Sequence, residues 1–132
     1  YALIVGVSDY TEGWPDLPGV KKDVTIVKQM FQEHGFHVTV VEDPTRLQLE
    51  QAFTDIIKQF GQSSDNRLVF YFAGHGETER LADMTSMGYI IPKDCPLLSK
   101  DPRGFSSHAI SMNDIESFLK QDNTLLLCPF PD

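Results

Sequence analysis

A histidine between two glycines, Gly74-His75-Gly76, follows the most apolar run of the chain, residues 68–73. Such a run is typical of a strand buried on both faces, as in a parallel sheet. Active sites of open α/β sheets form beyond the carboxyl ends of their strands, so His75 stands where an imidazole could act as acid and base. The two glycines allow a sharp turn and let another chain approach His75 closely. The alternative is an ordinary loop histidine after a core strand.

A second reactive residue, Cys128, ends the last predicted strand, 124–128. If that strand and the strand before His75 are neighbours in a parallel sheet, Cys128 and His75 lie at the same edge. An imidazole there could take the proton of the thiol, and the resulting thiolate is a nucleophile. The amides of Gly76 and of the cysteine could then hold a developing oxyanion. Because cysteine is also among the most buried residue types, a structural Cys128 is the alternative.

The elements that must position these residues alternate in type along the chain. The expected strands cover residues 1–7, 36–42, 67–73 and 124–128, and the expected helices cover 21–34, 46–60 and, more briefly, 111–120. Loops are expected over 8–19, 74–88 and 95–108, with a short extended piece at 89–92; the loop 74–88 is predicted to be a mobile surface loop near His75. This order predicts one three-layer α/β/α domain over residues 1–132, with a mainly parallel sheet of about four strands.

The composition limits the class of partner. Eleven basic and 19 acidic residues give a net charge of −8, which argues against nucleic acid or an anionic membrane surface. No apolar stretch approaches the roughly 20 residues of a membrane helix. Cys95 and Cys128 form neither a disulfide framework nor a zinc pattern, which favours a reducing, cytoplasmic setting without a cofactor. The first strand ends without a glycine-rich phosphate loop, which counts against a nucleotide-binding domain.

Five segments carry motifs, and they extend over nearly the whole chain: YALIVGVSDY (1–10), LPGVKKD (17–23), HGF (34–36), FYFAGHG (70–76) and GYIIPKD (88–94). They resemble the large-subunit (p20-like) part of the caspase/metacaspase clan of cysteine peptidases. Metacaspases are the more similar branch, because Leu17 stands where animal caspases have an arginine that holds a substrate aspartate. The resemblance implies a caspase-like fold and a thiol endopeptidase acting on peptides or proteins, with a preference for residues other than aspartate, such as basic ones.

The resemblance also implies roles for individual residues. His75 matches the catalytic base, Gly76 matches an oxyanion-hole amide, and Asp23 matches an acid that lines the pocket for the residue before the cut. For Asp23 the alternative is a solvated carboxylate near a helix N-terminus, where a negative charge is favourable.

Other matches concern calcium and the rim of the sheet. Asp94, Asn113 and Asp114 fall near positions that bind calcium in some metacaspases, although a turn and a helix cap explain these residues equally well. Residues 8–10 reach the same rim as His75, and no role is assigned to them.

The chain departs from the Asp-x-Cys-x-Gly motif that holds the nucleophile in the family. Leu126 stands where the aspartate is expected, and Pro129 biases Cys128 toward an extended backbone. Cys128 is therefore either a displaced nucleophile or a plain strand cysteine. Correspondingly, the domain is either a peptidase or a catalytically inactive scaffold or regulatory interaction module.

The small-subunit (p10-like) strands of the family do not follow the last predicted strand. This predicts a truncated domain whose last strand lies at an exposed edge, where a small-subunit-like part or a second copy could pair with it.

Overall fold

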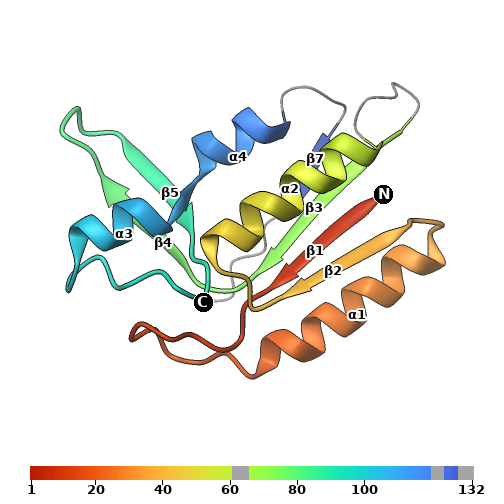
Figure 1. Ribbon diagram of the computed structural model, residues 1–132, viewed down its shortest axis with the longest axis horizontal. Coiled ribbons are helices and arrows are strands. Elements are labelled where there is room, and N and C mark those ends of the chain that lie inside the picture. Colours follow the sequence, from red (N-terminus) through yellow and green to blue (C-terminus); the bar gives the residue numbers. More distant parts are fainter. Residues whose placement is uncertain (61–65, 120–123, 128–132) are drawn as a thin grey trace.

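A four-stranded parallel sheet forms the centre of the molecule (Figure 1). The computed structural model describes residues 1–60, 66–119 and 124–127. The strands are β1 (Ala2–Gly6), β2 (Val38–Glu42), β3 (Leu68–Ala73) and β7 (Thr124–Leu127), in the order β2-β1-β3-β7. All four predicted strands are confirmed within two residues at each end. β3 and β7 are parallel neighbours, as expected, and β7 ends the sheet order within the part of the chain that is described.

Helices cover both faces of this sheet, so the predicted three-layer architecture is confirmed (Figure 1). On one face, Ala2 and Ile4 of β1 pack against α1 (Gly19–Glu33). On the other, Leu3 and Val5 pack in the core that α2 (Arg46–Phe60) contributes to. α4 (Met112–Leu119) lies on the same face as α2, where the rings of Phe118 and Phe53 stack with centroids 5.4 Å apart. Every residue of β1 is buried, which explains the strong apolar signal of this strand.

Local capping sets the ends of the first two helices. α2 has the predicted bounds because Thr45 and Gln48 form a capping box: the Gln48 amide donates to Thr45 Oγ1 (3.3 Å) and the Thr45 amide to Gln48 Oε1 (3.0 Å). α1 begins two residues earlier than predicted. After α1, Gly35 adopts φ +84°, and the Phe36 amide donates to the Phe31 carbonyl (3.0 Å), as in a Schellman motif.

A second, antiparallel sheet was not predicted. It contains β4 (Gly76–Arg80), β5 (Ser86–Ile90) and β6 (Ile110–Ser111), in the order β4-β5-β6. The prediction of a mobile loop over 74–88 is therefore wrong, because most of these residues form a hairpin. Two features conceal it in the sequence: β4 is polar and none of its residues is buried, and the connecting turn has Met84, not glycine, at φ +70°.

The prediction of a loop over 95–108 is also wrong, because α3 (Pro102–His108) lies within it. Asp101 caps this helix by accepting a hydrogen bond from the Gly104 amide (2.9 Å), and Pro102 suits the first helical position. α4 confirms the predicted third helix, and the Ser111 hydroxyl accepts from the Asp114 amide (3.0 Å) at its start. No helix in residues 1–60, 66–119 or 124–127 is long and apolar enough to cross a membrane.

Candidate functional site

His75 lies where the winding of the parallel sheet changes direction. From β1 the chain continues to β2 on one side, whereas the next parallel strand after β3 is β7 on the other side. β1 and β3 are neighbours, so the segments that follow them meet beyond the carboxyl edge of the sheet. Ligands of open α/β sheets bind at this kind of position. Here the His75 amide donates to the Tyr10 hydroxyl oxygen (2.8 Å), which joins the exits of the two strands.

The His75 imidazole is held from three directions. Its ring centroid lies 4.8 Å from that of Tyr10 and 5.1 Å from that of Trp14. Its Nε2 lies 2.7 Å from the carbonyl oxygen of Pro15. Because a carbonyl can only accept, Nε2 must carry the hydrogen, and the neutral ring therefore has its lone pair on Nδ1. The segment after β1 thus fixes both the orientation and the tautomer of the imidazole.

The peptide between His75 and Gly76 has a defined direction. The Ile91 amide donates to the His75 carbonyl (3.1 Å), and Gly76 lies opposite Ile90 in the hairpin. This pattern makes Gly76 and Ile90 a non-hydrogen-bonded pair of the antiparallel ladder. The Gly76 N–H therefore points away from β5, and β4 is an edge strand of the described sheet. An amide in this position can donate to a ligand beside His75.

Gly74 is required by the close approach of Tyr10. A Cβ at residue 74 would lie 2.8 Å from the Tyr10 hydroxyl oxygen and 2.8 Å from Cζ of Phe72. Both distances are shorter than side chains tolerate. Gly74 therefore accommodates the Tyr10 hydroxyl beside His75, and the approach of another chain to His75 stays a prediction.

The structure does not bring Asp23 to His75. Asp23 is exposed in α1, and none of the contacts found among the described residues joins it to His75 or Gly76. Leu17, which precedes α1, packs against the α1 core, and its amide donates to the Ser8 carbonyl (2.7 Å). The substrate-pocket role of Asp23 stays a prediction.

The two carboxylates expected near calcium are linked by Arg46. Its backbone amide donates to Asp94 Oδ1 (2.9 Å), and its Nη2 lies 3.9 Å from Asp114 Oδ2. The same guanidinium donates through Nη1 to the Ala109 carbonyl (2.7 Å). Over the described ranges, no three His, Cys, Asp or Glu side chains are grouped so that they could hold a metal ion. A calcium site therefore stays a prediction.

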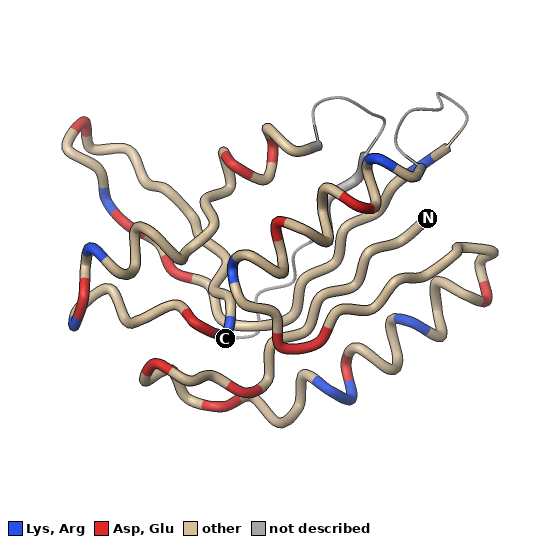
Figure 2. The backbone as a smooth tube through the Cα atoms, viewed as in Figure 1, with Lys and Arg blue, Asp and Glu red and all other residues tan. Residues whose placement is uncertain are grey.

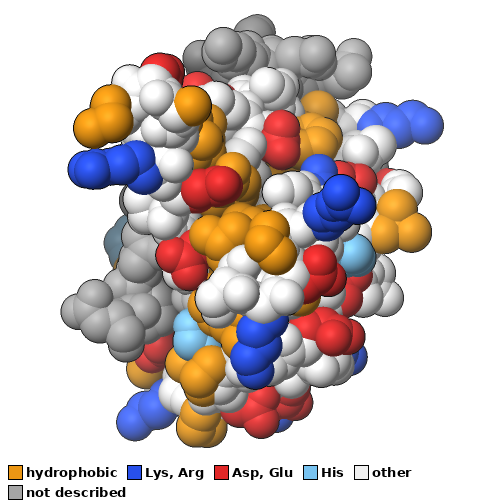
Figure 3. Space-filling model, turned by 90° about the vertical axis from the view of Figure 1, so that its left-hand side faces the viewer, with side chains coloured by type: hydrophobic (Ala, Val, Ile, Leu, Met, Phe, Trp, Pro, Cys, Tyr) orange, Lys and Arg blue, Asp and Glu red, His pale blue; other side chains and the backbone are white. Residues whose placement is uncertain are grey.

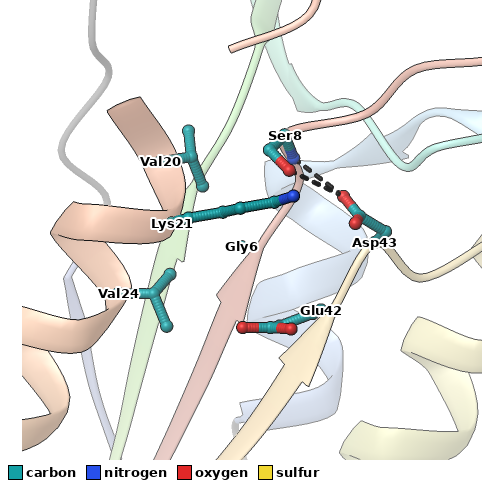
Figure 4. Close-up of a pocket in the computed structure, with 7 residues that line it drawn as sticks. All are labelled: Gly6, Ser8, Val20, Lys21, Val24, Glu42 and Asp43. Atoms are coloured by element: carbon teal, nitrogen blue, oxygen red, sulfur yellow. Dashed lines mark hydrogen bonds between the residues drawn. The ribbon is translucent and has the colours of Figure 1, made fainter. Parts of the chain in front are cut away.

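Asp43 organises the exit of β1, a role that sequence reasoning missed. Its Oδ1 accepts from the amide of Ser8 (2.8 Å; Figure 4). It also accepts from the amide of Asp9 (3.1 Å), and the Asp43 backbone has φ +49°. A small hollow, open to solvent, lies beside it, and Lys21 extends across this hollow from α1 (Figure 4). The lining residues are Gly6, Ser8, Val20, Lys21, Val24, Glu42 and Asp43. His75 is not among them, so the contribution of Asp43 is to hold the loop that carries Tyr10.

Cys95 is the cysteine that lies within the described residues. Cys95 is fully buried and free, and burial, helped by the negative charge of Asp94, raises its pKa to about 12. Its thiol therefore stays protonated near neutral pH and is unsuited to be a nucleophile. Cys128 lies outside the described residues.

Acidic residues accumulate at the carboxyl edge of the parallel sheet. Asp9, Glu12 and Asp16 lie in the loop after β1, and Glu42 and Asp43 lie at the end of β2 (Figure 2). On the face that carries the hairpin and α3, acidic side chains alternate with basic and apolar ones (Figure 3). Lys21 and Lys22 at the start of α1 offset part of this charge, and Lys21 Nζ lies 3.9 Å from Asp9 Oδ2. The excess of acidic residues leaves a weaker negative potential near the β1 and β2 exits.

Comparisons with known proteins agree with this arrangement. Residues 1–128 match the sequence model of the caspase domain of C14 peptidases. The Drosophila initiator caspase Dronc is similar in structure, with a TM-score of 0.70 at 17% identity over 98% of this chain and 47% of that one. Protein GSU0716 from Geobacter sulfurreducens is similar with a TM-score of 0.69 at 17% identity over 96% of this chain and 47% of that one.

This chain spans about half the length of those two structures. No curated protein matches it. The match over residues 1–128 shows that the chain belongs to the caspase-domain family of C14 peptidases, as its motifs predicted.

Proposed function

We propose that this domain is the histidine-bearing part of a caspase-type cysteine endopeptidase, with His75 as its acid and base. The observation that carries the proposal is the fixed position of the imidazole: the Pro15 carbonyl accepts a hydrogen bond from Nε2, and the rings of Tyr10 and Trp14 pack against the imidazole ring. A ring held in this way offers a lone pair on Nδ1 beside the outward Gly76 amide. Base and oxyanion donor are both parts that acyl transfer through a thiolate needs.

In the proposed reaction, the thiol of the nucleophile gives its proton to Nδ1 of His75, and the thiolate attacks the scissile carbonyl carbon. The electron pair moves onto the carbonyl oxygen, which accepts a hydrogen bond from the Gly76 amide. When the tetrahedral intermediate collapses, the C–N bond breaks and the imidazolium gives its proton to the leaving amine. A water molecule, deprotonated by the same imidazole, then hydrolyses the thioester. Cys128, which follows β7 beside β3, is the proposed nucleophile.

The proposed substrate is a peptide with a residue other than aspartate, and preferably a basic one, before the cut. Leu17 has no charge with which to hold a carboxylate. The acidic residues around the exits of β1 and β2 would attract a cationic side chain and repel an anionic one. Asp23 is the proposed specific partner of that cation.

A thiol-reactive peptide probe that carries a basic residue tests this proposal on the chain or on any longer natural form that contains it. We expect labelling at Cys128 that falls at least about a hundredfold in His75→Ala, because general base catalysis is lost. His37→Ala is the matched control, since His37 precedes β2 at the opposite edge of the sheet and stacks only on Tyr1 among the rings described. Unchanged labelling in His75→Ala would reject the role of His75.

The departure from the family's nucleophile motif favours a second candidate, an inactive caspase-like domain that acts as a scaffold or regulatory module. Leu126 and Pro129 replace residues expected around the nucleophile. The same probe separates the candidates, because an inactive domain leaves Cys128 unlabelled in the unmodified protein. Stable association with a second protein in the absence of any turnover would support this second candidate.

A further inference from the structure

Tyr10 interrupts the hairpin ladder at His75. In a regular antiparallel ladder, the pair that follows the non-hydrogen-bonded pair Gly76–Ile90 exchanges two backbone hydrogen bonds. That pair is His75 and Ile91. One of its bonds is present, from the Ile91 amide to the His75 carbonyl (3.1 Å). The other is replaced: the His75 amide donates to the Tyr10 hydroxyl oxygen (2.8 Å), and the Tyr10 hydroxyl donates to the Ile91 carbonyl (3.1 Å).

The insertion is built into the surrounding structure. Gly74 leaves the space that the hydroxyl occupies, since a Cβ there would come within 2.8 Å of it. The Tyr10 amide donates to Asp16 Oδ1 (3.0 Å), which holds the loop in place. Burial raises the pKa of the Tyr10 hydroxyl far above its ordinary value, so the group stays protonated and able to donate at physiological pH.

We propose that Tyr10 is a positioning residue for His75 and Gly76, whose hydroxyl keeps the end of the ladder open so that the imidazole reaches Pro15 and the Gly76 amide faces the substrate. This inference rests on the proposed function of His75. Without the hydroxyl, the His75 amide and the Ile91 carbonyl would have to pair directly or remain unsatisfied. Direct pairing would draw residue 75 toward β5 and pull its ring away from the Pro15 carbonyl.

The chain offers a matched pair of variants for the test. Tyr10→Phe removes the bridging hydroxyl and keeps the ring beside His75. Tyr89→Phe removes a hydroxyl from the same hairpin, one that donates to Glu79 Oε2 (3.1 Å) at a distance from the ladder end. Tyr10→Phe removes the two hydrogen bonds of the bridging hydroxyl, whereas Tyr89→Phe removes one hydrogen bond that does not involve His75 or Ile91. The control therefore reports the effect of losing a tyrosine hydroxyl elsewhere in the same hairpin.

The first readout is nuclear magnetic resonance, and it needs no enzymatic activity. In Tyr10→Phe, we expect the His75 ring nitrogens to lose the single Nε2–H tautomer signature, and the amide signals of His75 and Gly76 to shift. In Tyr89→Phe, these signals should remain as in the unmodified protein. Signals that are unchanged in Tyr10→Phe, or equally changed in both variants, would overturn the proposal. If Tyr10→Phe does not fold, the test is made on the unmodified protein. A slowly exchanging Tyr10 hydroxyl proton near the His75 amide would support the insertion of Tyr10 into the ladder, and rapid exchange of that proton with water would refute it.

The second readout is peptidase turnover. We expect Tyr10→Phe to lower kcat about ten- to a hundredfold with KM changed less than about twofold, since the misplaced groups act in the transition state. Unchanged kcat would overturn the proposal. If the unmodified protein shows no turnover, the proposed peptidase function fails, and the resonance signals alone decide whether Tyr10 positions His75.

Discussion

The two sheets of this domain differ in how far their strands are buried. All five residues of β1 are buried, and its side chains enter the cores on both faces of the parallel sheet. In β4 no residue is buried, and the antiparallel sheet is joined to the rest by the buried Ile90 and Ile110 and by hydrogen bonds from Tyr10 and Arg46. Apolar burial is non-directional and tolerates approximate placement, whereas hydrogen bonds require their partners at defined positions. Because β4 has no buried residue and β5 only one, the antiparallel sheet has a weak apolar pattern in the sequence.

The candidate site lies where these two sheets meet. His75 follows β3 of the first sheet and precedes β4 of the second. The rigid sheet places its backbone, while the segment after β1 orients its ring and amide. The proposed chemistry therefore depends on both kinds of interaction, and variants of each sheet should affect stability and geometry differently.

The largest expected effect on stability comes from the core of the parallel sheet. Phe70 is 2% exposed, and its ring centroid lies 4.6 Å from that of Phe53. Phe70→Ala should lower the free energy of unfolding by about 3–5 kcal/mol, through lost burial and the cavity left behind. Met87→Ala in half-buried β5 should cost less than about 1 kcal/mol. Urea denaturation measures both, and equal losses would contradict the contrast between the sheets.

Arg46→Met tests the connection between the two sheets. It leaves the carbonyl of buried Ala109 without its guanidinium donor and should cost about 2–3 kcal/mol. We expect faster amide hydrogen exchange in β5 and β6, with β1 and β3 unchanged. Arg103→Met, at an exposed position on α3, is the control and should change neither the free energy of unfolding nor the amide hydrogen exchange of the two sheets. Uniform acceleration in both sheets would show that Arg46 supports the whole fold and not the junction.

Cys95 should give the second sheet and its surroundings a distinct response to alkaline pH. Its thiol packs with Ile91 and Phe105, and burial raises its pKa from 9.0 to about 12. Between these values the native state holds a proton that the unfolded state has lost, so stability falls as pH rises above about 9 and is unaffected below. The expected loss from this group is about 1.4 kcal/mol per pH unit. The contribution of Cys95 is isolated by measuring the free energy of unfolding of Cys95→Ala and of the unmodified protein at pH 8 and pH 10. An equal change in this free energy between the two pH values in both proteins would contradict the prediction.

The smallest expected effects compare two helix caps. Thr45 caps α2, which the sequence pattern predicts, and Asp101 caps α3, which it missed. Thr45→Ala and Asp101→Ala should each cost about 1 kcal/mol, because each removes one acceptor for a helix amide. Thermal unfolding of both variants measures this. A negligible loss in only one of them would show that its helix end is held by tertiary contacts instead.

Particular elements show why prediction succeeded or failed. α2 was predicted to the residue because its apolar spacing and its capping box agree. α3 is only seven residues long, so it shows little periodicity, although Asp101-Pro102 is a readable start signal. β4 is polar throughout and has no alternation to detect. At the site, the place of His75 was predictable from β3, but Pro15 and Tyr10 are 60 and 65 residues away in sequence.

The amino-acid sequence was enough to predict the parallel sheet, the helices on its two faces, the family and the place of His75 at the end of β3. The sheet, the helices and the place of His75 follow from apolar spacing, which lies in neighbouring residues and needs no distant partner, whereas the family follows from the motifs that the chain shares with it. Only the tertiary structure decided the tautomer of His75, the direction of the Gly76 amide and the insertion of Tyr10 into the ladder. Those features depend on which loops meet beyond the carboxyl edge of the sheet, because a hydrogen bond exists only when folding brings its donor and acceptor together.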